Sequence, residues 1–293
     1  MTAFFKRLHE HATPLRYTAL AVVLIVVALA LLAPLVAPHD PIAQDVANKL
    51  RPVGTPGHPL GTDQFGRDSL SRLIYGAQVE IVVALGATLF ACIFGTFLGL
   101  MGGYFGRLIE TVTMRLTDVI LAFPPIILAL LIVTIYGSGV MTLIVVMGLL
   151  FAPNFARITY GQVVGVKHAE YVEAAKAIGA PTPRILLRVV LPNIMSPIAV
   201  QMSLTLASAI LLESGLSFLG LGVVPPTASW GLMVAEGQRF MASNPDLLLA
   251  PAIAVVATIL SFSILGDALR DWLDPRSRKT SRPKVTALTE VRA

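Results

Sequence analysis

Residues 170–193 read EYVEAAKAIGAPTPRILLRVVLPN and form a charged segment between two strongly apolar stretches. The surrounding chain is 55% hydrophobic and 13% charged, whereas a soluble domain carries about 25% charged residues. Such a chain cannot cover its apolar surface with polar side chains, so we expect lipid to be its solvent. A polar, ordered segment between membrane spans is expected to contact something in water.

Six apolar runs are long enough, or nearly so, to cross a bilayer, which takes about 20 residues. We therefore predict an all-α polytopic membrane protein with six transmembrane helices. The first run follows Lys6, Arg7 and Arg16, as a secretory signal would, but its apolar core exceeds the length of a signal, which favours an anchor. The predicted spans are 17–37, 79–101, 119–137, 140–160, 194–213 and 247–266.

The distribution of lysine and arginine predicts the orientation of these spans. If the N-terminus lies in the cytosol, the internal segments carry 17 of the 22 basic residues, as the positive-inside rule requires. Both chain ends and the polar segment are then cytosolic. The internal segments are 1–16, 102–118, 157–193 and the tail 267–293; the external segments are the loop 38–78, 138–139 and 214–246.

The spans carry signals for packing and bending. Ala91, Gly95, Gly99 and Gly103 recur every four residues, a pattern that lets two helices approach closely in lipid. Pro124 and Pro125, near the expected cytosolic start of the third span, and Pro153 within the fourth span favour kinks or breaks. The external segment 214–246, which carries Pro225, Pro226 and Trp230, is expected to form a re-entrant or interfacial lid.

Several functions are disfavoured by what the sequence lacks. Cys92 is the only cysteine, which excludes disulfides and cysteine-based metal sites within the chain. The histidines are scattered and are interpreted as structural or surface residues, with only a weak metal-ligand spacing between two of them, so no metal site is expected. A net charge of +5 is interpreted as membrane-flanking charge, and no nucleic-acid partner is expected. The histidines are His9, His11, His39, His58 and His168.

The polar segment predicts a short helix followed by a sharp turn. Tyr171, Ala174, Ala175 and Ile178 share one face of a helix over 170–179. Gly179 supplies the left-handed residue that ends a helix, and two following prolines prevent its continuation. A second short amphipathic piece then leads into the fifth span. A helix resting on lipid headgroups is one interpretation; docking to a protein is favoured because alanines permit close approach.

The segment Glu173-Ala174-Ala175, then Gly179, then 189–192 (VVLP) resembles the EAA signature of ATP-binding-cassette importer permeases, with Val189 replacing the usual isoleucine. Three further stretches, at 61–77, 213–234 and 265–276, look like the C-type permease subunit of the dipeptide, oligopeptide and nickel importers. The GTD–GRD stretch within 61–77 indicates the C-type rather than the B-type partner.

This resemblance implies a type I importer permease fold with a permease core over 79–266 and a cytosolic coupling segment at 168–190. The implied function is translocation of peptides across a bacterial inner membrane by ATPase-driven alternating access; nickel or another small solute is the alternative. The implied partners are a B-type permease, two cytosolic ATPase subunits, an external solute-binding protein and the lipid bilayer. The implied ATPase-coupling residues are Tyr171, Glu173, Ala174, Ala175, Gly179, Leu191 and Pro192.

The chain has no phosphate-binding loop, so we expect no ATPase activity and no cofactor in this chain, with ATP and magnesium bound by the partner ATPase subunits. A membrane enzyme is disfavoured because neither a nucleophile elbow nor a zinc-protease motif occurs. A passive channel or secondary transporter remains compatible with six spans. Dependence of transport on ATP would separate these classes.

Intramembrane polar residues are expensive and often functional. We predict that such residues line a translocation path; hydrogen bonding between helices is an equal alternative. For Glu80 and Glu213, we predict that the side chains face the path or a partner subunit rather than lipid. Asp63, Arg67 and Asp68 suggest a local ion-pair network, and Asp63 is also a candidate cap of a helix beginning near Gln64. The candidate path residues are Glu80, Gln201, Thr205, Ser208, Glu213, Thr258 and Ser261.

Overall fold

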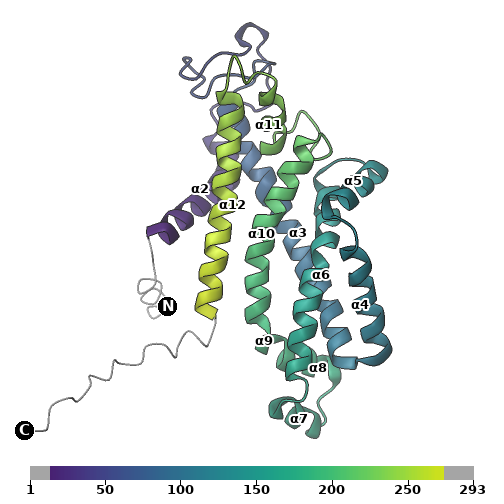
Figure 1. The fold of residues 1–293 in the computed structure, drawn as a ribbon. Coiled ribbons are helices and arrows are strands. Elements are labelled where there is room, and N and C mark those ends of the chain that lie inside the picture. The colour runs from purple at the N-terminus through teal and green to yellow at the C-terminus, as the bar shows by residue number, and fades with distance from the viewer. Residues whose placement is uncertain (1–13, 274–293) are drawn as a thin grey trace, which may run out of the picture.

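A computed structural model describes residues 14–273, and its regular structure is helical (Figure 1). Four long helices and a bent helix pair form a bundle, and an oblique N-terminal helix packs beside it. The elements are α2 (Pro14–Val36), η1 (Val46–Asn48), α3 (Ser69–Phe105), α4 (Arg107–Leu121), α5 (Pro125–Tyr136), α6 (Val140–Val166), α7 (Glu170–Ala177), α8 (Thr182–Ile185), η2 (Leu186–Val190), α9 (Leu191–Asn193), α10 (Met195–Phe218), α11 (Trp230–Gln238) and α12 (Asp246–Leu273).

Five of these helices are long and apolar enough to cross a membrane: α2, α3, α6, α10 and α12. If the bent pair α4 and α5 is counted as one span, it is the sixth, although its two helices are bent by 90° relative to each other. Because α3 ends beside α7 and α6 begins at the other end of the bundle, the pair has to return the chain across it (Figure 1). The all-α polytopic fold is therefore confirmed.

Small residues bring α3 and α6 into close parallel contact. A Cβ added at Gly95 or Gly99 would overlap a backbone carbonyl oxygen of α6, at Ala152 or Ala156 respectively. Gly103 faces Val163 one turn further along. The stripe of small residues thus serves helix packing, as predicted, and it lets dispersion contacts replace the hydrophobic force that is weak between helices in lipid.

Helix boundaries differ from prediction at both ends of α3. Helix α3 spans 37 residues, about 55 Å at 1.5 Å per residue, so it includes the last part of the predicted external loop 38–78. The segment 102–118, predicted as a cytosolic connection, is helical almost throughout: α3 continues to Phe105 and α4 begins at Arg107. The sequence-based reading missed α4 because this helix is amphipathic rather than uniformly apolar.

The predicted single helix 119–137 is wrong. Residues 122–124 separate α4 from α5, and Pro125 is the first residue of the new helix. Pro124 and Pro125 cannot donate backbone hydrogen bonds, so α4 ends before them, and the break predicted at these prolines is confirmed. Arg157 of α6 holds α4 near this break by an ion pair with Asp118, 2.7 Å long.

The two ends of the bundle are distinct. Loop 38–68 and α11 cover one end, and α7, α8 and α9 lie at the other (Figure 1). Arg16, near the start of α2, pairs with Asp271, near the end of α12, at 2.6 Å. The predicted cytosolic ends 1–16 and 267–293 lie outside the described residues at 1–13 and 274–293.

Candidate functional site

Helix α7 has well-defined ends. Glu170 and Glu173 lie in its first turn and Lys176 in its last, the arrangement that favours the helix dipole. Gly179 adopts the predicted left-handed conformation with φ +76°, and the Ala180 amide donates to the Ala175 carbonyl at 3.1 Å. These two features form a Schellman-type C-cap, so the chain turns sharply after two turns of helix.

The inner face of α7 packs onto the bundle through Val172. This side chain is completely buried and belongs to the same apolar cluster as Phe155 and Val163 of α6 and Val190 of η2. Ala175 packs partly against this cluster. The sequence-based reading placed the apolar stripe one residue away and missed Val172, although a valine between two glutamates was visible in the sequence. Helix α7 is therefore held by packing against the bundle as well as by its covalent connections at both ends.

The outer face of α7 is exposed. Ile178 is 85% exposed, and Tyr171 and Ala174 are exposed beside it. We call Tyr171, Ala174 and Ile178 the outer face of α7. An isoleucine this exposed, on a helix that is otherwise fixed in place, is typical of a surface that a partner covers.

The segment after α7 connects it directly to α10. Helix α8 leads into a π-helical turn, η2, which ends at Val190; α9 follows, and α10 begins at Met195. Ile185 and Leu186 are buried in the cluster that contains Val172, as is Ile198 of α10. The sequence-predicted residues Leu191 and Pro192 lie at this junction, half-buried and exposed respectively. A displacement of α7 would therefore be transmitted to α10 through packed side chains.

The charges on α7 are arranged on its solvent side. Lys176 Nζ lies 2.9 Å from Glu173 Oε1, and this hydrogen bond is the main cause that lowers the pKa of Glu173 and raises the pKa of Lys176. The Lys176 ammonium also lies 5.8 Å from the ring centre of Tyr104 on α3. Glu173 therefore stays ionised at an exposed position, available to a partner.

The predicted path residues are mostly engaged within helices. Thr258 and Ser261 are buried and donate to carbonyl oxygens of their own helix, at Ala254 and Ala257, both at 2.7 Å. Thr205 is buried and accepts a hydrogen bond from the half-buried Gln201 at 3.1 Å. Ser208 alone among these five is exposed.

Glu80 and Glu213 meet inside the chain. Both are completely buried, Glu80 on α3 and Glu213 on α10. Ser214 donates to Glu80 at 3.2 Å and Ser217 donates to Glu213 at 2.7 Å. The two carboxyl groups therefore lie between α3 and α10.

The GTD–GRD stretch forms a buried ion-pair network at the other end of the bundle. Arg67 pairs with Asp63 at 2.6 Å, and Arg67 and Arg72 both reach Glu236 of α11, at 3.2 and 3.1 Å. Arg67 is 3% exposed, so the network is a buried one rather than a surface feature. This network fixes α11 across the end of the bundle.

The expected helix cap at Asp63 is wrong. Asp63 accepts hydrogen bonds from the amides of Phe65 and Arg67 within a turn, and the helix begins at Ser69. Asp68 is the cap, because its carboxylate accepts from the amide of Ser71 at 2.8 Å. The sequence offers aspartates at both positions, and only the fold of the preceding loop selects the second.

The chain is thus an apolar helical bundle that fixes a short polar helix at one end and leaves the outer face of that helix uncovered. The family described as the inner membrane component of binding-protein-dependent transport systems matches residues 95–279. The N-terminal transmembrane domain of oligopeptide transport permease C matches residues 12–52. The chain belongs to this family of permease subunits of ATP-binding-cassette importers, as a C-type subunit.

Relatives match along almost the whole chain. The dipeptide transport system permease protein DppC of Haemophilus influenzae is 36% identical over 88% of this chain and 89% of its own. DppC of Bacillus subtilis is 37% identical over 90% and 83%, respectively. The glutathione transport system permease protein GsiD of Pectobacterium atrosepticum is 36% identical over 87% and 84%.

A solved structure shares the fold. A chain of the MetNI methionine transporter in an inward-facing conformation superposes with a TM-score of 0.55 at 17% identity, covering 69% of this chain and 96% of that chain. At this identity the match shows the importer permease fold alone. Membership in the family implies that the chain works in a bilayer with other permease and ATPase subunits.

Proposed function

We propose that the chain is the C-type permease of an importer that moves short peptides inward across a bacterial inner membrane, driven by ATP hydrolysis in partner subunits. The observation that carries this proposal is the geometry of α7: its inner face is packed into the bundle through Val172, and its outer face is exposed. The names of the relatives support peptides as the solute class.

The mechanism follows from how α7 is attached. The outer face of α7 docks in a groove of a cytosolic ATPase subunit, where small side chains such as Ala174 permit close approach and Glu173 supplies a fixed negative charge. Closure of the ATPase pair on ATP moves α7, and the cluster around Val172 passes that motion to α6 and α10. The side on which the transport path is open then switches.

The chain supplies about half of the path, together with a homologous B-type permease, and an external binding protein delivers the solute. Two cytosolic ATPase subunits bind ATP and magnesium, and this chain contributes no catalytic group. Within the path we place Ser208 and Gln201, because Ser208 is exposed and Gln201 is half-buried on one face of α10. Thr205, Thr258, Ser261, Glu80 and Glu213 act instead in packing between helices, since their side chains are buried.

Substitution on the outer face of α7 tests the proposal. Ile178→Glu places a second carboxylate in the docking surface, and we expect at least a tenfold loss of affinity for the ATPase subunit, with loss of dipeptide uptake in reconstituted vesicles. The matched control is Met241→Glu, because Met241 is also exposed but lies between α11 and α12, and α11 covers the end of the bundle opposite to α7. Full ATPase stoichiometry and normal uptake in Ile178→Glu would overturn the proposal.

A further inference from the structure

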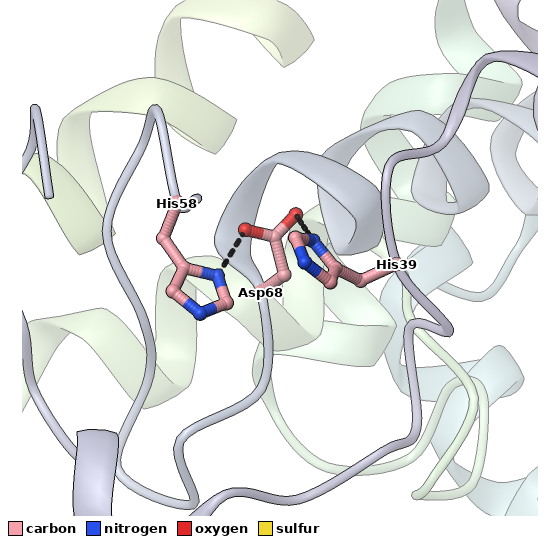
Figure 2. Close-up of side chains that lie close together, drawn as sticks. All are labelled: His39, His58 and Asp68. Carbon is pink, nitrogen blue, oxygen red and sulfur yellow. Dashed lines mark hydrogen bonds and ion pairs between the residues drawn. The ribbon is translucent and has the colours of Figure 1, made fainter. Parts of the chain in front are cut away.

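Three potential metal ligands from distant parts of the loop region meet beside the start of α3. His39 follows α2, His58 lies in the middle of loop 38–68, and Asp68 is the N-cap of α3 (Figure 2). One ligand atom from each lies within 4.8 Å of the others. In the sequence, His58 is 19 residues from His39 and 10 residues from Asp68, so the histidines are scattered along the chain. Only the fold of the loop brings the three side chains together.

Their geometry is close to that of a small metal site. His58 Nδ1 lies 2.9 Å from Asp68 Oδ1, and His39 Nδ1 lies 3.8 Å from Asp68 Oδ2. Ligand atoms around a tetrahedral metal with bonds of about 2 Å are about 3.3 Å apart, a value between these two distances. The two imidazole rings lie 4.8 Å apart, both turned toward the carboxylate (Figure 2).

The carboxylate is buried and is held for this role. Asp68 is 1% exposed, and both the amide and the hydroxyl of Ser71 donate to its Oδ2 at 2.8 Å. The Ser71 hydroxyl in turn accepts from the His39 amide at 3.0 Å. Hydrogen bonds of this kind around a metal ligand fix its orientation.

The charge balance also favours a cation. The two nearby arginines, Arg67 and Arg72, are directed to Asp63 and Glu236. Among the described residues, the ion-pair partners of Asp68 are His39 and His58, and neither arginine reaches it. A buried carboxylate is costly unless a positive charge or a metal compensates it.

We propose that His39, His58 and Asp68 bind a divalent transition-metal ion of the zinc class. Two imidazole nitrogens and one carboxylate oxygen are ligands that suit Zn²⁺, Ni²⁺ or Cu²⁺, whereas Mg²⁺ and Ca²⁺ prefer oxygen ligands alone. The half-exposed His39 is the ligand that moves to close the site, and water takes the remaining position. The ion fastens the loop to α3 from two points, directly after α2 and at mid-loop.

Zinc binding to the full chain in detergent tests this site. His9 and His11 are replaced by glutamine and the protein is purified without a histidine tag, so that neither the N-terminal histidines nor a tag binds zinc. With Zn²⁺ as the probe, we expect about one tightly bound ion per chain by elemental analysis, and X-ray absorption showing two imidazole ligands and one carboxylate. The transport proposal does not depend on this result, because it concerns the other end of the bundle.

The variants separate this site from general zinc binding. His39→Gln and His58→Gln are each expected to weaken zinc binding at least about tenfold, whereas the exposed His168→Gln, on the α7 side, leaves it unchanged. Asp68→Asn keeps a residue able to cap α3 but removes the charge, and weakens binding as well. Zinc retained by the His39→Gln/His58→Gln double variant, or no zinc bound at 100 μM (about a hundredfold above a micromolar Kd), would overturn the proposal.

Discussion

The two ends of the helix bundle differ in their charged contacts. At the loop end, α11 is held by apolar packing of Trp230 and Met233 and also by buried charges, with Arg67 and Arg72 both reaching Glu236. At the other end, α7 is fixed by an apolar side chain, Val172, and the ion pair between Lys176 and Glu173 on this helix is exposed. The buried arginines of the loop end are paired with carboxylates of the same chain, whereas α7 presents a face that the chain does not cover.

This difference has a consequence for motion. A buried network of charges has a narrow range of acceptable geometries, so the loop end is expected to move as a rigid unit. Apolar packing such as that of Val172 tolerates small sliding movements between helices. The end that carries α7 is therefore the one suited to receive and pass on a displacement.

The largest expected effect is at the loop end. Arg72→Gln removes a cation that is 1% exposed and leaves Glu236 and Asp63 with one arginine between them. Breaking a buried ion pair from one side costs about 3–5 kcal/mol, so we expect a large drop in the thermal unfolding temperature in detergent.

The control for Arg72→Gln is Arg188→Gln, because Arg188 is exposed near the other end. We expect this control to unfold at the wild-type temperature. Equal unfolding temperatures for the two variants would show that the buried charges do not hold the loop end.

The second effect concerns the attachment of α7. Val172→Ala removes buried carbon atoms from the cluster shared with α6 and α10 and is expected to cost about 2 kcal/mol locally. ATPase subunits should still co-purify, because the outer face is unchanged, while the amount of peptide moved per ATP hydrolysed falls. Ala177→Gly, on the exposed side of the same helix, controls for lowered helix propensity. Normal coupling in Val172→Ala would contradict a role for this contact in transmission.

A smaller effect is expected at the glutamate pair. Glu80→Gln and Glu213→Gln preserve shape and an acceptor oxygen for Ser214 or Ser217, so each is expected to change stability by less than about 1 kcal/mol. Uptake should stay near the wild-type rate, because both side chains are buried within this chain. Loss of uptake with unchanged stability would place these carboxyl groups in the path after all.

The smallest effect is at the surface pair of α7. Lys176→Met should return the lowered pKa of Glu173 toward its ordinary value, which carboxyl-labelled NMR can measure. A lowered folded-state pKa gives stability above the unfolded-state pKa, and that stability is lost as pH falls through the folded-state value. Wild type and variant should therefore differ near neutral pH and converge in acid, and the difference should shrink with salt. An unchanged pKa would mean that Lys176 is not the cause.

Features that depend on nearest neighbours along a helix could be predicted from sequence. The close approach of another helix at Gly95 and Gly99 follows from their four-residue spacing, and the turn at Gly179 follows from a glycine placed before prolines. The same reasoning located α7 itself. These predictions succeed because spacing on one helix is fixed by the helix geometry.

Features that depend on the path of a loop could not be predicted. Glu236 joins Arg67 across 169 residues, and His39 and His58 meet at Asp68 only because the loop folds back on α3. The inward position of Val172 was missed for a related reason, because an eight-residue helix has two possible buried faces and only tertiary packing selects one.

Cysteine labelling of α7 tests the central claim most directly. Cys92 is the only native cysteine, so Ile178→Cys in a Cys92→Ser background gives a single reactive site on the outer face of α7. We expect rapid labelling by a water-soluble maleimide from the cytosolic side in the isolated chain, and strong protection once the ATPase subunits are bound. Labelling from the opposite side of the membrane, or an unchanged rate in the assembled transporter, would contradict the account.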